Sequence, residues 1–228
     1  MKGWTLHPSS GKNWILCIRI RIYVLFHPST RMNLAVTGNL TMDAGASIDV
    51  TACGNSPYGV GADNTGGTYG GKGSGNAVGC YGSIRRPTDY GSSGVGGSGT
   101  SSGGGAIRLA VAGDFVLNGA VRSNGRDGLY RVGSGGSVWL DAARIVGADT
   151  GIISARGTDG SNLTSGGGRI ALYLRDPDAR FSDFGGTITA RGGTGNHRVE
   201  KGWCVPGCGG GGRIALRAST FEVGDLEA

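Results

Sequence analysis

The sequence predicts an all-β fold, a right-handed parallel β-helix (β-solenoid) of about five coils with long glycine-rich loops. A glycine run that turns at once into a short apolar strand occurs four times from residue 103 onward. The third strands of consecutive repeats stand 32 and 35 residues apart, at Val121, Ile153 and Ile188. One such unit cannot bury its own apolar face, so neighbouring units stack into a common core. The handedness follows from the strong right-handed preference of parallel crossover connections.

The first strand of each repeat alternates apolar and other side chains, which places alternate residues on one face. The repeats begin at 103–111, 135–140, 166–174 and 210–217. Two inward columns are predicted. The first is Ile107, Val138, Ile170 and Ile214, and the second is Leu109, Leu140, Leu172 and Leu216.

The later strands of each repeat predict further columns. The third strand supplies a β-branched column of Val50, Val121, Ile153 and Ile188 and a small-residue column of Ala52, Ser123, Ala155 and Ala190. The second strand supplies Phe115, Ile145, Phe181 and Phe221.

The chain divides into a leader, a repeat region and one insertion. Residues 1–31 form either an unstructured leader or an N-terminal capping segment, because 18–22 alternate like a strand with one apolar face. Residues 32–228 are the parallel β-helix, whose first coil is 32–54. The Gly/Ser-rich insertion at 55–102 is too polar to bury its own core, so we expect a mobile, protease-sensitive loop. The coil that begins at 210 stops before its third strand, which predicts end-to-end self-association or further repeats of a longer chain.

Glycine and charge decide between broad classes. Glycine makes up 49 of the 228 residues, which is typical of low-complexity disorder when it lacks a period. Here the glycines fall in blocks between apolar strands, so disorder suits the loops only. Residues 1–31 hold five of the basic residues and no acid, although the whole chain has a net charge of +6. The nearly neutral repeat region lacks the charge typical of nucleic-acid binding.

Four cysteines lie in or beside the glycine-rich loops, and disulfides between them would suit a secreted or cell-surface protein. These candidate disulfide cysteines are Cys53, Cys80, Cys204 and Cys208. A four-thiolate zinc site is the less favoured alternative, because only the downstream pair has the spacing of structural zinc ligands. Cys17 leaves an odd thiol. We therefore expect no metal and no cofactor.

Two phosphate-binding patterns are present in the insertion but lack their structural context. Residues 94–99 match G-x-G-x-x-G without a flanking helix, and residues 66–72 match a P-loop that continues with Gly73 instead of Ser or Thr. Tandem calcium-binding nonapeptides are also absent from the sequence.

The pattern of a glycine run followed by Arg-Ile-Ala-Leu, at 166–172 and 210–216 and with small changes at 103–109, resembles the glycine-rich repeats of very large bacterial secreted or surface proteins. Those regions are β-helical and are often attached to adhesin or polysaccharide-related modules. The resemblance covers residues 32–228 and carries over no catalytic residue. It implies a non-catalytic structural or adhesive segment of a larger secreted or cell-surface protein, with a polysaccharide or another surface polymer as partner. The apolar stretch at 14–26 is too short to cross a bilayer as a helix, so we expect no membrane span.

One outward patch favours a carbohydrate-binding or polysaccharide-cleaving β-helix as the alternative. Trp139, Asp141, Tyr173 and Arg217 fall on the outward face of neighbouring first strands, where aromatic rings can lie on a sugar and charges at its edge. An ordinary exposed β-face with mixed side chains explains the same residues. Cleavage needs convergent carboxylates, or a base beside a metal, and no acid pair recurs on neighbouring coils. An enzyme is therefore the less favoured interpretation.

Overall fold

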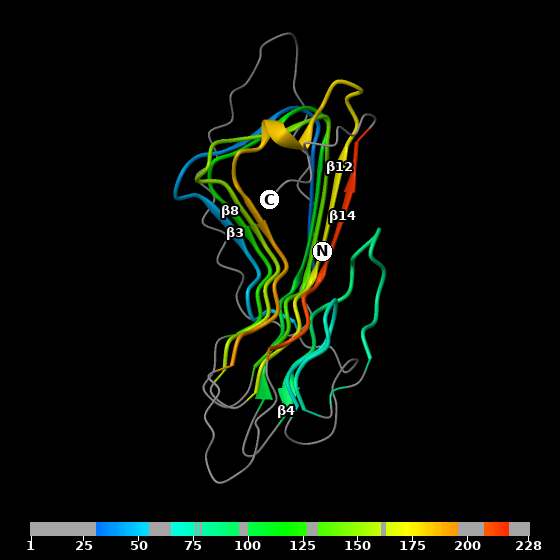
Figure 1. The fold of residues 1–228 in the computed structure, drawn as a ribbon. Coiled ribbons are helices and arrows are strands. Elements are labelled where there is room, and N and C mark those ends of the chain that lie inside the picture. Colours follow the sequence, from blue (N-terminus) through cyan, green and yellow to red (C-terminus); the bar gives the residue numbers. More distant parts are fainter. Residues whose placement is uncertain are drawn as a thin grey trace.

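The computed structural model is all-β, with fourteen strands and one short 3₁₀ helix in the residues that it describes. These are residues 31–54, 65–75, 77, 79–95, 100–126, 132–160, 163–195 and 208–218. Most strands belong to three parallel sheets that surround a shared interior (Figure 1). The leader at 1–30 lies outside the described residues, and the first strand begins at Arg31.

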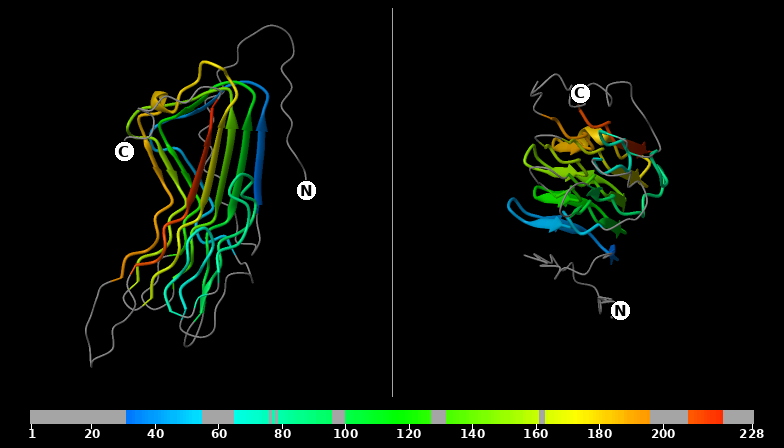
Figure 2. Two further views of the ribbon diagram at one scale, coloured as in Figure 1. Left: turned by 45° about the vertical axis from the view of Figure 1, so that its right-hand side comes forward. Right: turned by 90° about the horizontal axis from the view of Figure 1, so that it is seen from below.

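The longest sheet, which we call sheet A, holds the strands that follow the glycine runs. Its order is β1, β6, β9, β12, β14, all parallel, so neighbours in the sheet come from consecutive repeats (Figure 2). The strands are β1 (Arg31–Val36), β6 (Ala106–Val111), β9 (Ser137–Ala142), β12 (Arg169–Leu174) and β14 (Arg213–Arg217).

The second and third strands of each repeat form two shorter parallel sheets. Sheet B contains β2 (Leu40–Met42), β7 (Phe115–Leu117) and β10 (Ile145–Val146). Sheet C contains β3 (Ser47–Asp49), β8 (Ala120–Arg122), β11 (Ile152–Ser154) and β13 (Thr187–Thr189). The chain therefore passes through sheets A, B and C in turn and then returns to A.

The fourth repeat departs from this order in sheet B. It has the 3₁₀ helix η1 (Phe181–Asp183) where the other repeats have a strand, although Phe184 still bridges to Gly147 in parallel. Phe181 and Phe184 are buried and join the shared core. Phe181 was predicted to lie in a second strand, but it lies in a helical turn. Phe221, predicted for the same column, lies outside the described residues.

The two columns predicted for sheet A are confirmed for three repeats. Ile107, Val138 and Ile170 pair in register and are at most 1% exposed. The leucine column behaves in the same way at Leu109, Leu140 and Leu172. Ile214 keeps the register, but it is 44% exposed, so its predicted burial is wrong. The reason is that β14 is the last strand of sheet A and pairs only with β12 among the described strands.

The predicted register of sheet C is wrong in the first repeat by two residues. Val121 pairs with Ile48, not with Val50. Val50 instead occupies the position predicted for Ala52. Its carbonyl accepts from the Gly105 N–H, and in the next repeat the Ser123 carbonyl accepts from the Gly136 N–H in the same way. A shift of two preserves the inward face of a strand, so alternation alone does not distinguish the two registers.

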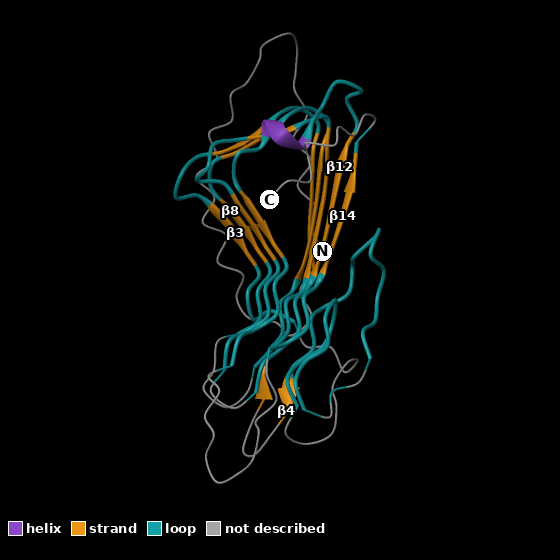
Figure 3. Cartoon of the chain, viewed as in Figure 1, coloured by secondary structure: helices purple, strands orange, loops and turns teal. Residues whose placement is uncertain are grey.

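The glycine runs pack backbone against backbone where one repeat passes into the next. The run that opens each repeat donates to the end of the preceding repeat, as in Gly168 N–H to the Ala155 carbonyl at 2.7 Å. A Cβ on Gly135 would lie 2.0 Å from the Ala155 oxygen, and one on Gly167 would lie 1.9 Å from the Ala190 oxygen. Only glycine permits this approach. Figure 3 shows these segments as the loops that continue below the three sheets.

The insertion is packed, contrary to the expectation of a loop without a buried interior. In its described part, Tyr69, Thr65, Thr68 and Ser92 are fully buried. The Gly66 N–H donates to the Ser74 carbonyl, the Ser74 N–H donates to the Thr164 carbonyl, and the Gly67 N–H donates to the Val132 carbonyl. Hydrogen bonds to the glycine runs therefore replace the apolar core that the insertion lacks. It also contributes β4 (Gly94–Val95) and β5 (Thr100–Ser101), which form an antiparallel pair.

Candidate functional site

The outer face of sheet A is the candidate site, because it gathers the aromatic and charged side chains predicted to bind a ligand. Alternate residues of the five strands form three rows across this face. The first row is Arg31, Ala106, Ser137, Arg169 and Arg213; the second is Asn33, Arg108, Trp139, Ala171 and Ala215; the third is Ala35, Ala110, Asp141, Tyr173 and Arg217. Five of these residues are arginine and one is an acid, so the face is positively charged.

The structure brings the four predicted residues together. Tyr173 lies in register between Asp141 and Arg217. Its ring meets that of Trp139 edge-on, with 6.3 Å between centroids. The Arg217 guanidinium lies 6.0 Å from the centroid of the Tyr173 ring.

Two arginines that the sequence analysis did not include complete this patch. The Arg108 guanidinium lies 4.4 Å from the Trp139 ring centroid, a cation–π distance. Arg175 Nε lies 2.6 Å from Asp141 Oδ1. Asp141 is therefore held by an ion pair, and the patch consists of aromatic rings between cations. Arg108 occupies the same position in its repeat as Trp139 does in the next, and this register could have placed Arg108 in the predicted patch.

A segment of the insertion, residues 79–90, lies over this face, and we call it the flap. Figure 1 shows it in blue-green beside β12 and β14. Arg169 donates to the Tyr81 carbonyl from Nε at 3.0 Å and from Nη2 at 2.6 Å. The Tyr173 hydroxyl donates to the Arg85 carbonyl, and the Ser137 hydroxyl donates to the Asp89 carbonyl at 2.6 Å. The flap has no apolar periodicity, so its sequence carries no signal of this contact with sheet A.

Tyr69, earlier in the insertion, packs beneath the flap. Its hydroxyl lies 2.7 Å from the Ser137 hydroxyl, and its ring centroid lies 4.9 Å from that of Tyr81. The Arg169 guanidinium lies 5.2 Å from the Tyr69 ring. Burial raises the pKa of Tyr69 to about 12, so this hydroxyl is neutral at physiological pH.

Two buried N–H groups on this face have no hydrogen-bond partner among the residues that the structure describes. They are Trp139 Nε1 and Arg169 Nη1, on the neighbouring strands β9 and β12. Unsatisfied buried donors are rare in proteins and call for an explanation. Arg169 as a whole is only 5% exposed.

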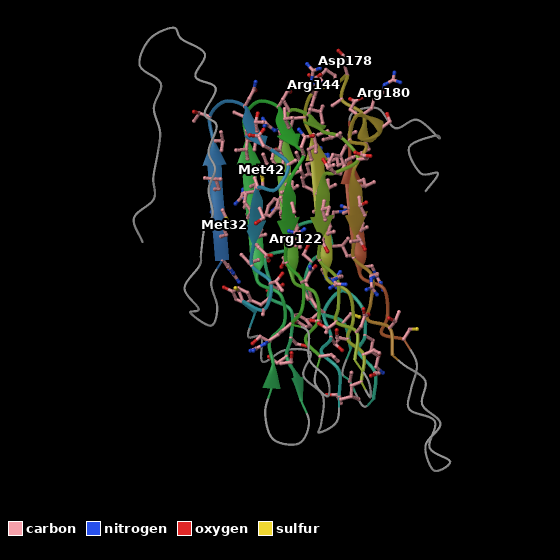
Figure 4. All side chains as sticks on the ribbon, turned by 90° about the vertical axis from the view of Figure 1, so that its left-hand side faces the viewer. Met32, Met42, Arg122, Arg144, Asp178 and Arg180 are labelled. Carbon is pink, nitrogen blue, oxygen red and sulfur yellow. The ribbon has the colours of Figure 1, made fainter. Side chains whose placement is uncertain are left out.

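Several aspartates away from the patch are bound to arginines between repeats. Arg144 Nε lies 3.5 Å from Asp114 Oδ1 and 3.0 Å from Asp176 Oδ2, near the passage from sheet A to sheet B (Figure 4). Arg191 bonds both oxygens of Asp159 at 3.0 and 2.9 Å. That contact, with bonds from Thr194, lowers the pKa of Asp159 to about 2. These carboxylates join successive repeats.

The predicted disulfide cysteines lie apart from this site. Cys53, Cys80 and Cys208 are free thiols, and Cys204 is outside the described residues. Burial, followed by the charge of Asp49, raises the pKa of the Cys53 thiol. Within the described ranges, no group of three or more His, Cys, Asp or Glu side chains could hold a metal ion.

No protein-family model, curated protein or solved structure matches this sequence. In the part of the chain that the structure describes, no helix is long and apolar enough to cross a membrane.

Proposed function

We propose that this chain is a right-handed parallel β-helix that serves as a non-catalytic structural or adhesive segment of a larger secreted or cell-surface protein. The observation that carries the proposal is the register of the three parallel sheets. Each of the first four repeats places one strand in sheet A and one in sheet C beside its counterparts, and one apolar core runs through the stack. Such an arrangement is an extended scaffold that grows by adding repeats.

The contacts between repeats support a structural role. Arg144 joins the second, third and fourth repeats through Asp114 and Asp176. Asp159 and Arg191 join the third to the fourth. These ion pairs hold Asp114, Asp176 and Asp159 against arginines of neighbouring repeats.

Labelling of intact cells with an antibody against this chain tests the proposed location. We expect labelling of intact cells, or the protein in the culture medium, without permeabilisation. Detection only after lysis, with a cytosolic protein as the control for leakage, contradicts the proposal.

Binding of carbohydrate on the outer face of sheet A is the second candidate function, and cleavage of a polysaccharide there is its less supported extension. The Trp139–Tyr173 pair favours binding, because aromatic rings can lie against a sugar ring and the neighbouring arginines can donate hydrogen bonds to its hydroxyl groups. Titration of the purified chain with oligosaccharides tests it. Loss of binding in a Tyr173→Ala variant is the expected result, and unchanged binding contradicts it.

A further inference from the structure

We propose that the outer face of sheet A, beneath the flap, binds the carboxylate groups of an acidic polysaccharide, with Arg169 and Trp139 as the donors. The inference deepens the carbohydrate-binding function proposed above and rests on it. It names both the ligand class and the two side chains that select the ligand.

Arg169 is a buried cation with an incomplete set of partners. Its Nε and Nη2 share a single acceptor, the Tyr81 carbonyl, and its flat face lies toward the Tyr69 ring. Nη1 has no partner, and no carboxylate is paired with Arg169 among the described residues. Asp89 of the flap acts on the Tyr69 hydroxyl together with Arg169, but no described ion pair joins these two side chains. A buried guanidinium without a paired carboxylate is costly, so an anion that reaches it gains a strong, charge-assisted contact.

Trp139 supplies a second donor close to the first. Trp139 and Arg169 lie on adjacent strands and one row apart, which places their Cα atoms roughly 8 Å from each other. Indole Nε1 donates one hydrogen bond and accepts none, and within the described part of the chain it has no acceptor. One carboxylate presents two acceptor oxygens, so a single ligand group can satisfy both orphan donors.

The charge of the surrounding face favours a polyanion. Arg31, Arg108, Arg213 and Arg217 share the face with Arg169, and the one acid in the rows, Asp141, is already paired with Arg175. Patches of one sign raise the local concentration of oppositely charged ligands. The aromatic rings of Trp139 and Tyr173 add apolar surface that suits a sugar ring.

The flap contacts sheet A through neutral acceptors. Its three contacts with sheet A described above all use backbone carbonyls, those of Tyr81, Arg85 and Asp89. A carboxylate is also an acceptor, and it adds a full negative charge. At Nη1 it therefore gives Arg169 a counter-charge, while Nε and Nη2 keep the Tyr81 carbonyl.

Calorimetric titration of the full chain with hexagalacturonate tests the proposal, with its methyl ester as the uncharged form of the same sugar. We expect the ester to bind at least about tenfold more weakly, since it loses a hydrogen bond to a charged group. Arg169→Gln should weaken hexagalacturonate binding about tenfold or more. Trp139→Phe keeps an aromatic ring and removes only the N–H, and a loss of about threefold to tenfold is expected. Arg122→Gln, on sheet C, is the matched control and should leave binding unchanged.

The outcomes separate this inference from the function on which it rests. Equal affinity for acid and ester overturns the carboxylate site and leaves carbohydrate binding in place. Binding of neither overturns both. Tighter binding of a single-stranded hexanucleotide assigns the face to nucleic acid and overturns the proposal. If Arg169→Gln unfolds the flap, Trp139→Phe decides: unchanged affinity in that variant contradicts the site.

Discussion

At the scale of single residues, the structure depends on backbone positions that tolerate only small side chains or unusual torsions. Ala52 is the one described non-glycine residue with a positive φ, 62°, in the turn that ends the first repeat. An L-residue there is strained by roughly 1–2 kcal/mol. Glycine would adopt this positive φ without the strain that the Ala52 Cβ causes.

Replacing Ala52 by glycine should stabilise the protein. Relief of strain exceeds the added entropy of the unfolded chain, so we expect a gain of about 0.5–1 kcal/mol. Thermal unfolding followed by circular dichroism measures it. Ala46→Gly, in an earlier turn without a positive φ, is the control and should not stabilise; a lower melting temperature for Ala52→Gly contradicts the strain argument.

Asp159 should make stability depend on acidity. Its pKa falls from 3.8 to about 2 on folding, because Arg191 and Thr194 bond the charged form. The carboxylate therefore stabilises the fold above about pH 4, and this contribution is lost as pH falls toward 2. Its side chain is 43% exposed, so the effect is below about 1 kcal/mol.

Denaturant unfolding between pH 5 and pH 2 checks this, with the pH slope of Asp159→Asn compared with that of the wild type. The variant should lose part of the slope below about pH 4. Asp149→Asn, at an exposed position, serves as the control. Identical slopes in Asp159→Asn and the wild type would show that Asp159 titrates alike in the folded and unfolded chain.

At the scale of elements, the glycine runs fix the distance between repeats. Each run passes so near the preceding repeat that a single methyl group meets a carbonyl. In sheet A the apolar side chains therefore stack from repeat to repeat. At the glycine runs, backbone packs directly against backbone. Glycine is needed for contact here, and not for freedom of torsion.

Gly135→Ala should disrupt the joint between the third and fourth repeats. Its Cβ would lie 2.0 Å from the Ala155 oxygen and 2.5 Å from the Gly168 nitrogen. Overpacking against backbone of this kind costs about 3 kcal/mol or more. Gly38→Ala, whose Cβ meets nothing within 4 Å, is the control and should change stability by less than about 1 kcal/mol. Equal melting temperatures for the two variants contradict the close packing.

Sequence patterns predicted the repeating strands well, but they did not predict that the insertion packs against sheet A. The inward columns of Ile107 and Leu109 follow from alternation and glycine punctuation, which are local. The burial of Tyr69 and the contact of Tyr173 with Arg85 join segments far apart in the chain and use backbone carbonyls, which leave no periodic signal. Alternation predicted that the patch residues share one face. It carries no signal that Trp139 Nε1 and Arg169 Nη1 lack partners among the described residues.

At the scale of the whole molecule, the last strand of sheet A has an uncovered apolar surface. Ile214 is 44% exposed although its counterparts are buried, and β14 has one pairing partner among the described strands. Open edges of this kind pair with other chains. Further repeats of the same protein would cover it equally well.

Sedimentation velocity of the isolated chain should therefore show association that rises with concentration. Ile214→Lys should reduce it, because a charge at the exposed edge opposes pairing. Ile84→Lys is the control, because Ile84 lies in the flap and is the other exposed large apolar residue among those described. A monomer at high micromolar concentration contradicts the prediction.

The stacking of repeats is the central claim, and a disulfide cross-link between register partners tests it most directly. Thr41 in β2 and Val116 in β7 are partners in sheet B, and Val146 in β10 is the next partner of Val116. In a cysteine-free background, Thr41→Cys with Val116→Cys should cross-link under mild oxidation, because adjacent strands lie about 4.8 Å apart. Thr41→Cys with Val146→Cys spans two strand spacings, about 10 Å, and should stay reduced. Cross-linking of the second pair, or of neither, would contradict the stacked, parallel order of the repeats.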